Sequence, residues 1–182
     1  MPLSLNPDRA GQAGALTVLT PIAPGAEPAL RAYLEGLRAG PSPLSRLPRT
    51  HFGRWVIVPD LVAEDEREPT RLESPQLLFT ASFDGSLDAY LDELCRVLAA
   101  EAREIWGRCT GAPSPPEGAA LKAYLRAHHQ RTGYFVAAYP QAAVDEVRAA
   151  LSQRDAVIAF ARAAQEMDPA ALQAAFHERL GG

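Results

Sequence analysis

The sequence predicts one α+β domain in which helices cover an antiparallel four-stranded sheet, followed by a helical extension at the C-terminus. Three observations favour this fold class. A strand leads directly into a long amphipathic helix between Gln76 and Cys109. Other segments with the composition of strands alternate with helical patterns along the chain. The 182 residues, of which 47% are hydrophobic and 22% charged, suit one soluble globular domain with a substantial core.

The stretch from Gln76 to Cys109 has the clearest pattern. It starts with the apolar and β-branched segment 77–81, which predicts a strand. It then turns at Asp84-Gly85-Ser86, where glycine accepts a positive φ and Asp or Ser can cap a helix. The apolar side chains that follow recur at helical spacing over roughly six turns. They are Leu87, Tyr90, Leu91, Leu94, Val97, Leu98, Ile105 and Trp106.

Composition and turn residues predict the remaining elements. We expect further strands at 15–22, 50–59 and 133–139. We expect helices at 28–37 and 119–130, and three short helices at 142–151, 155–165 and 169–180. Segment 63–74 is acidic and contains prolines, which predicts a solvated loop, and 111–118 is a loop by composition. Residues 1–14 are rich in Pro, Gly, Asn and Asp, so we expect a flexible N-terminus.

This order, β-α-β-β-α-β, is that of a ferredoxin-like fold. We place the ferredoxin-like domain at 15–150 and a helical extension packed on it at 151–182. Both faces of the predicted strands carry bulky side chains. In strand 50–59, alternation places one set of side chains on one face, His51, Trp55 and Ile57, and the other set on the opposite face, Phe52, Arg54, Val56 and Val58. The simplest way to bury the outer face is to pack it against the sheet of a second subunit, which predicts a homodimer. The alternative is that the C-terminal helices cover the sheet within a monomer.

Net charge and cysteine content limit the classes of binding partner and the cellular compartment that we expect. The formal net charge of −4 and the scattered arginines argue against nucleic-acid binding, which needs a clustered positive field. No apolar run approaches the length of a membrane span. Cys95 and Cys109 are separated by about 21 Å if they lie on one helix, so they cannot pair with each other. Reduced thiols of this kind predict a cytoplasmic protein.

Several segments carry a resemblance to a known superfamily. They are THFGRWVIV, LLFTASFDGS with LDAYLDEL, EIWGRC and GYFVAAYP, between residues 15 and 150. Together with the strand order they resemble the dimeric α+β-barrel superfamily of ferredoxin-like proteins. More loosely, the FDGS…YLDEL and IWG segments resemble an uncharacterised bacterial family associated with haem peroxidases. The resemblance implies a small-molecule pocket, and it raises haem as a cofactor without carrying over a catalytic motif or a haem-ligand motif.

Two residues of strand 50–59 are candidate site residues. His51 lies beside Phe52 in an apolar strand, where it is either a hydrogen-bonded structural histidine or a haem ligand. Arg54 is unusual because strands rarely aim a guanidinium at a covered face without a partner. It either pairs with an acid such as Asp84 or Asp88, or it holds a ligand carboxylate or a haem propionate.

Trp55, Trp106 and His128 complete the candidate set. Trp106 either lines a pocket beside Gly107 or belongs to the core. His128 and His129 end a helix, where the backbone dipole favours a protonated histidine, and at most one of them faces inward. His177, in the last helix, is expected to be exposed. No HxxxH, CxxC or HExxH pattern occurs, so we expect no metal site.

The sequence leaves three functions open. The first is a small-molecule-binding protein whose pocket lies between the sheet and the helices, without a recognisable catalytic motif. The second is a haem-binding oxygenase or a peroxidase-like enzyme, with His51 or His128 as the iron ligand. The third is a non-catalytic accessory module that binds a partner enzyme, for which the acidic stretch Glu64–Glu68 offers a docking charge.

Overall fold

The structure is a computed structural model, and it describes residues 6–61 and 70–180. The chain divides into two compact units, Met1–Ala143 and Val144–Gly182. The acidic stretch Glu64–Glu68 lies outside the described residues. The end of the segment expected to be a loop at 63–74 belongs to a strand instead.

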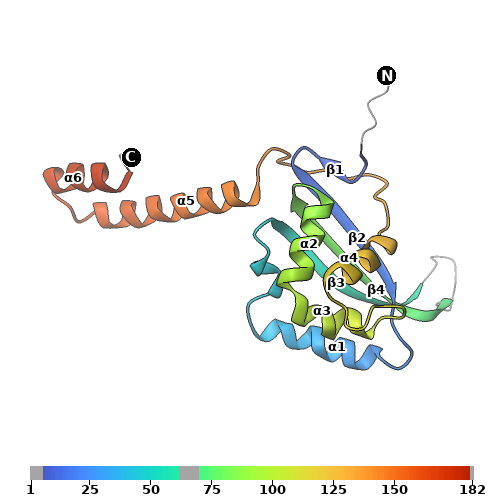
Figure 1. The fold of residues 1–182 in the computed structure, drawn as a ribbon. Helices are drawn as coiled ribbons and strands as arrows, with labels where there is room; N and C mark the ends of the chain where they lie inside the picture. The colour runs from blue at the N-terminus through green and yellow to red at the C-terminus, as the bar shows by residue number, and fades with distance from the viewer. Residues whose placement is uncertain (1–5, 62–69, 181–182) are drawn as a thin grey trace, which may run out of the picture. The chain divides into compact units, whose positions relative to one another are not determined.

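The first unit is an α+β structure built on a four-stranded antiparallel sheet (Figure 1). Its strand order is β1-β2-β4-β3, so β3 forms one edge and the short β1 lies at the other. Part of the N-terminal segment for which we expected flexibility therefore forms β1. The strands are β1 (Arg9–Ala10), β2 (Ala13–Pro21), β3 (Thr50–Leu61) and β4 (Thr70–Asp84).

The helices of this unit cover one face of the sheet (Figure 1). They are α1 (Glu27–Gly36), α2 (Leu87–Val97), α3 (Ala99–Ile105) and α4 (Gly118–Ala127), with 3-10 turns at Leu37–Ala39, Pro43–Arg46 and Trp106–Arg108. Ser86 caps α2, because its hydroxyl accepts from the Ala89 N–H at 3.2 Å. The single helix expected after Ser86 is interrupted at Leu98, where φ is −102° and ψ is 28°.

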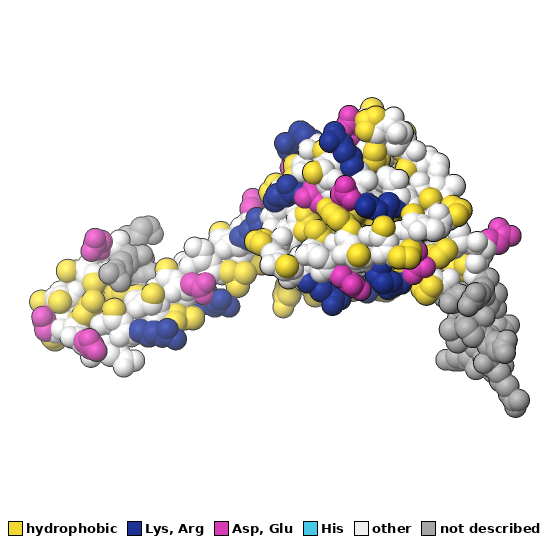
Figure 2. All heavy atoms as spheres, turned by 90° about the horizontal axis from the view of Figure 1, so that it is seen from below, with side chains coloured by type: hydrophobic (Ala, Val, Ile, Leu, Met, Phe, Trp, Pro, Cys, Tyr) yellow, Lys and Arg dark blue, Asp and Glu magenta, His cyan; other side chains and the backbone are white. Residues whose placement is uncertain are grey.

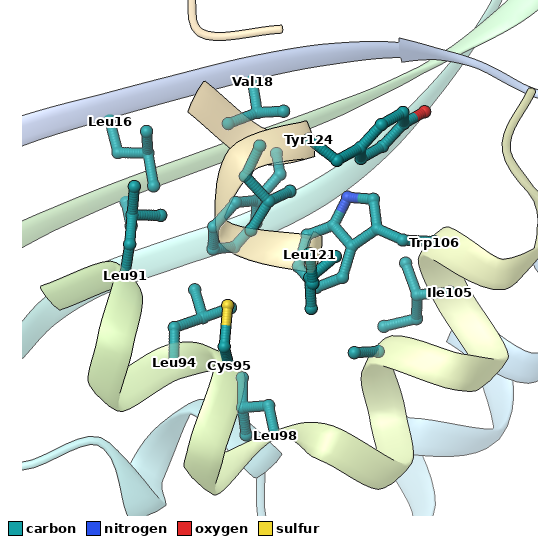
Figure 3. Packing of buried hydrophobic residues seen from close by; sticks show 14 of the residues in the cluster. Leu16, Val18, Leu91, Leu94, Cys95, Leu98, Ile105, Trp106, Leu121 and Tyr124 are labelled. Carbon is teal, nitrogen blue, oxygen red and sulfur yellow. The ribbon is translucent and has the colours of Figure 1, made fainter. Parts of the chain in front are cut away.

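The core lies between the sheet and the helices (Figure 3). Alternate residues of β2 and β4 point into it, among them Leu16, Val18 and Phe79. Trp106 is completely buried and lies edge-on against Phe79 at 5.5 Å between ring centroids. Cys95 and Cys109 are buried free thiols. Burial raises the pKa of the Cys95 thiol to about 11, which keeps it in the neutral form.

The strand expected at 133–139 is not formed, and this prediction was wrong. The edge of β2 that such a strand would pair with is already hydrogen-bonded to shorter pieces of chain. Ala15 N–H donates to the carbonyl of Asp8 at 2.8 Å, and Leu19 N–H to that of His128 at 3.1 Å. Other groups on this edge accept hydrogen bonds from Gln130 and Thr110. The backbone N–H and C=O groups with which a fourth long strand would have paired therefore already have hydrogen-bond partners.

Residues 131–139 instead form an irregular segment that is fixed at both ends. At its start, Thr132 N–H donates to the Asp8 carboxylate at 2.7 Å. Just beyond its end, the carbonyl of Pro140 accepts from Gln12 N–H, also at 2.7 Å. Desolvation of Asp8 is outweighed by its hydrogen bonds to Thr132 and the nearby His129, so its pKa is lowered. The segment has the composition of a strand, but it lies outside the sheet as irregular chain.

The second unit is a pair of helices, α5 (Val144–Ala164) and α6 (Pro169–Leu180). The two short helices expected at 142–151 and 155–165 are one continuous helix, because the intervening Ser152-Gln153-Arg154 contains no helix-breaking residue. Asp168 caps α6 by accepting from Ala170 N–H at 2.9 Å. Phe160 and Phe176 join the two helices edge-on at 6.1 Å. No helix in the described ranges is long and apolar enough to cross a membrane.

Tyr90→Phe is expected to reduce the loss of stability at alkaline pH. Tyr90 is fully buried, and burial raises its pKa from 10.0 to about 12. The unfolded chain ionises this phenol from about pH 10, whereas the folded protein keeps it neutral up to about pH 12. The stabilisation is therefore complete below pH 10 and is lost as the pH rises through 12.

Urea unfolding at about pH 8 and about pH 11 measures this effect. Tyr90→Phe also loses the 3.1 Å hydrogen bond to the Thr50 hydroxyl, which costs about 1 kcal/mol at both pH values. The decrease in unfolding free energy between the two pH values should be smaller in the variant than in the parent protein. Equal decreases would contradict the burial of an un-ionised phenol at this position.

Candidate functional site

The outer face of the sheet is the side turned away from α1–α4, and its residues alternate with those of the core. Strand register places Thr17, Thr80 and Arg54 in one row across β2, β4 and β3. The next row contains Ser82 and Phe52. This face therefore carries a line of hydroxyl groups that ends in a guanidinium and an aromatic ring.

Arg54 lies on the outer face, where its Nε donates to the Thr80 hydroxyl at 3.3 Å. Its side chain is exposed, and it makes no ion pair with any residue of the described part of the chain. The two acids proposed as its partners are engaged elsewhere: Asp84 with His51, and Asp88 with Lys122 and Arg126. Arg54 therefore keeps most of its hydrogen-bonding capacity for a ligand.

A hollow of about 500 Å³, here called the outer groove, surrounds Arg54 on this face. Phe52 stands on one side with 79% of its surface exposed. Phe135 contributes from the irregular segment 131–139, so the segment that does not join the sheet helps to form the groove. The outer groove is lined by Ala15, Leu16, Thr17, Phe52, Gly53, Arg54, Thr80, Ala81, Ser82, Thr132 and Phe135.

His51 lies at an irregularity in β3 rather than in regular register. The pairing with β4 shifts between Thr50 and Phe52, which leaves His51 as the extra residue of a bulge. Its Nε2 lies 2.7 Å from the Asp84 carboxylate, and both side chains are largely buried. The structure thus gives His51 a carboxylate partner that fixes its ring at the end of the sheet.

The two tryptophans lie on the core side of the sheet, opposite Arg54. Trp55 stacks on Phe79 at 5.3 Å and contacts Trp106 edge-on at 6.5 Å. Trp106 is completely buried, whereas Trp55 is partly exposed. The indole N–H groups of both are buried without a hydrogen-bond acceptor in the described part of the molecule. Trp106 is therefore a core residue in this structure, and Trp55 reaches from the core to the surface.

The two adjacent histidines have different environments. His128 packs against Tyr124 at 4.3 Å and its Nδ1 lies 2.9 Å from the carbonyl of the same tyrosine. His129 was not among the sequence candidates, but its Nδ1 lies 3.0 Å from the carbonyl of Thr17 and its ring faces Asp8. It attaches the end of α4 to β2. His177 is exposed, as expected.

The five sequence candidates do not converge on one pocket. Arg54 lies in the outer groove, Trp106 lies in the core, and His128 is at the end of α4. The residues do not fit a haem, because Nε2 of His51 is engaged by a carboxylate and Arg54 lies in a separate hollow. No group of three or more His, Cys, Asp or Glu side chains within the described ranges is arranged to hold a metal ion.

The sequence signalled Arg54 through strand alternation, but not the groups that surround it. Thr80, Ser82 and Phe135 come from other segments, and only the strand register and the path of residues 131–139 bring them to Arg54. The fold and the groove thus define an α+β protein with a candidate ligand site on an open sheet face. Comparisons with protein families, with curated proteins and with solved structures found no match for this chain.

Proposed function

We propose that this protein binds a small molecule carrying a carboxylate and an apolar ring, and that it does so in the outer groove. The observation that carries the proposal is the guanidinium of Arg54, exposed in the groove and paired with no acid of the described chain. Arginine recognises carboxylates through two parallel N–H···O bonds, which are stronger than hydrogen bonds between neutral groups. The hydroxyls of Thr80 and Ser82 offer further donors beside it.

The aromatic side chains of the groove favour a ring on the ligand. Phe52 and Phe135 both line it, and Phe52 exposes most of its surface to solvent. Stacking of a ligand ring on either phenylalanine removes apolar surface from water and adds about 0.5–1.5 kcal/mol per aromatic pair. A volume of about 500 Å³ lies within the range of small-molecule sites.

The lining supports binding rather than catalysis. The outer groove combines hydroxyls, apolar side chains and one guanidinium. Among the described residues that line it, none is a histidine, cysteine, aspartate or glutamate that could serve as a general base or an activated nucleophile. The chemistry that this set performs best is recognition of charge and shape.

Calorimetric titration with benzoate and with acetate tests the proposal. Arg54→Gln should weaken benzoate binding about 10- to 100-fold, which corresponds to losing about 1.5–3 kcal/mol of charge-assisted hydrogen bonding. Phe52→Ala should weaken benzoate binding but leave acetate binding unchanged. Arg126→Gln, at an exposed arginine in α4 that pairs with Asp88, is the matched control and should bind like the parent protein. Equal benzoate affinity in Arg54→Gln and the parent protein would overturn the proposal.

We also propose that the unit adopts the ferredoxin-like arrangement of the α+β-barrel superfamily. In support, β4 lies between β2 and β3, which are connected through α1, as in a split βαβ unit. The short β1 then occupies the place of the last strand of that fold. The two buried thiols support a reducing, cytoplasmic location.

A homodimer remains part of the proposal. Phe52 and Val56 are exposed apolar side chains on the outer face, where a second copy would cover them. Such a dimer would enclose the ligand of the outer groove between two sheets. Light scattering during size exclusion should give twice the chain mass, and Phe52→Lys should shift the protein to monomer. A parent protein that is still monomeric at a concentration of about 100 μM would contradict the dimer.

A further inference from the structure

A second hollow lies along the free edge of β3 and shares only Gly53 and Arg54 with the outer groove. Five consecutive strand residues, Gly53 to Ile57, line it on one side. The opposite side is formed by α1 and the two 3-10 turns that follow it. Because side chains of both faces of β3 contribute, this edge groove, of about 610 Å³, follows the strand edge itself.

The backbone groups at this edge can be assigned from the hydrogen bonds of the neighbouring strands. In β2, Leu19 N–H donates to His128 and Thr17 accepts from Gln130, so the odd-numbered residues point away from β4. The even-numbered residues of β2 then pair with β4, because successive residues of a strand point their backbone groups in opposite directions. The register places these even residues opposite odd-numbered residues of β4.

The same alternation continues across β4 to β3. The even-numbered residues of β4 are left to pair with β3, where they lie opposite Arg54 and Val56. The backbone N–H and C=O groups of Gly53, Trp55 and Ile57 therefore point to the free edge. None of them hydrogen-bonds to another described residue outside the sheet. The edge groove thus contains a row of backbone donors and acceptors without a partner strand.

The start of this row lies against a turn, whereas the rest of the row faces the edge groove. The 3-10 turn Pro43–Arg46 approaches β3 closely at Gly53, where an added Cβ would lie 2.8 Å from Leu44 Cδ1. Beyond Gly53 the strand edge faces the groove. Natural proteins cover or distort long free edges, since an open edge is a template for pairing with another strand. An open edge beside a helix is also the arrangement that binds extended peptides by strand addition.

The charges of the edge groove favour an acidic partner. Three arginines line it, Arg31, Arg38 and Arg54, with one acid, Glu35. Arg31 pairs with Glu27 at 2.6 Å, but Arg38 makes no ion pair within the described ranges. The side of the molecule that carries α1 shows basic side chains interspersed with acids and apolar side chains (Figure 2). Within the edge groove itself, the arginines outnumber the acid.

We propose that the free edge of β3 binds an extended acidic segment of a partner protein as an additional strand. The backbone of the segment pairs with Gly53, Trp55 and Ile57, and its acidic side chains lie beside Arg38 and Arg31. Five strand residues span about 13 Å at 3.3 Å per residue, so about five to six residues of the partner are held. This site gives a molecular basis to a non-catalytic accessory role, and it does not depend on ligand binding in the outer groove.

A fluorescein-labelled peptide of alternating Thr and Glu, about eight residues long, is the probe. The parent protein should bind it, and a peptide of alternating Thr and Lys should bind at least about tenfold more weakly. Arg38→Glu should weaken binding of the acidic peptide on the order of tenfold. Arg96→Glu, at a strongly exposed arginine of α2, is the control and should bind with little change. Equal binding of the acidic and basic peptides would overturn the charge assignment.

N-methylation of the peptide tests strand addition itself. Only alternate N–H groups of an added strand point toward β3. Methylating one alternate set of amides should abolish binding, and methylating the other set should leave it within about threefold. If both sets or neither abolish binding, the peptide does not pair with the strand edge. Phe52 lines the outer groove and not the edge groove, so Phe52→Ala should weaken benzoate binding and retain peptide binding, and failure at one site can be distinguished from failure at the other.

Discussion

Trp106→Ala is expected to lower the free energy of unfolding by about 3–5 kcal/mol, the usual cost of removing a large buried aromatic side chain. Trp106 is completely buried where the sheet meets the turn after α3. Its ring contacts Phe79 at 5.5 Å and Trp55 at 6.5 Å, so its removal leaves a cavity beneath β3 and β4. Chemical denaturation followed by far-ultraviolet circular dichroism measures the change.

Trp106→Phe separates a core role from a pocket role. The indole N–H of Trp106 is buried without an acceptor, so phenylalanine loses volume but also removes an unsatisfied polar group. We expect this variant to cost less than half as much as alanine and to bind benzoate like the parent protein. Since the chain has two tryptophans, the fluorescence that remains belongs to Trp55. Loss of benzoate binding in a folded Trp106→Phe protein would place this residue in the ligand site.

Gly11→Ala is expected to destabilise the protein by about 2–4 kcal/mol, through backbone strain and a direct clash. Gly11 has a φ of +63°, which costs any residue with a Cβ about 1–2 kcal/mol. An added Cβ would also lie 2.1 Å from the carbonyl oxygen of Pro140. That carbonyl accepts a hydrogen bond from Gln12, so the clash separates the end of segment 131–139 from the β1–β2 turn.

Gly25→Ala is the matched control for this prediction. Gly25 has a φ of +76°, but an added Cβ would meet no heavy atom within 4 Å. It should therefore lose only the backbone contribution, about 1–2 kcal/mol. Thermal unfolding of both variants measures the difference between them. Equal destabilisation would mean that Pro140 does not hold its place against the β1–β2 turn.

Sequence patterns predicted most of the helices and strands of the first unit, because each of these elements depends on residues that are neighbours in the sequence. The strand at 77–81, the turn at Asp84-Gly85-Ser86 and the cap of α2 all depend on residues close together in sequence. Apolar periodicity likewise predicted helices at 28–37 and 119–130 and one long helix after Ser86, which correspond to α1, to α4 and to the pair α2 and α3. The interruption at Leu98 had no such signal, because no proline or glycine marks it.

Segment 133–139 shows where local reasoning stops. GYFVAAY has the composition of a strand, but a strand also needs a free edge to pair with. Asp8, His128, Gln130 and Thr110 already occupy that edge of β2, and they come from three separate parts of the chain. No pattern within the segment reports this competition. The same limitation concealed Phe135 as a wall of the outer groove.

The prediction of candidate site residues was limited in the same way, because it used the pattern of one strand without its neighbours. Alternation placed Arg54 opposite Trp55, and the structure has them on opposite faces of β3. Alternation also grouped His51 with Trp55, but the bulge at His51 takes it out of that register and Asp84 binds it. A bulge is a property of two paired strands, so one strand read alone does not reveal it.

The most direct test of the central proposal, a carboxylate site at Arg54, is an NMR titration of the labelled protein with benzoate. The Arg54 Nε–H signal and the amides of residues lining the outer groove should shift and saturate together, with no comparable shifts around Trp106 or His128. In Arg54→Gln the same amides should stay at their unliganded positions at equal benzoate concentration. Shifts that are unchanged in Arg54→Gln, or that centre on His128, would contradict the account.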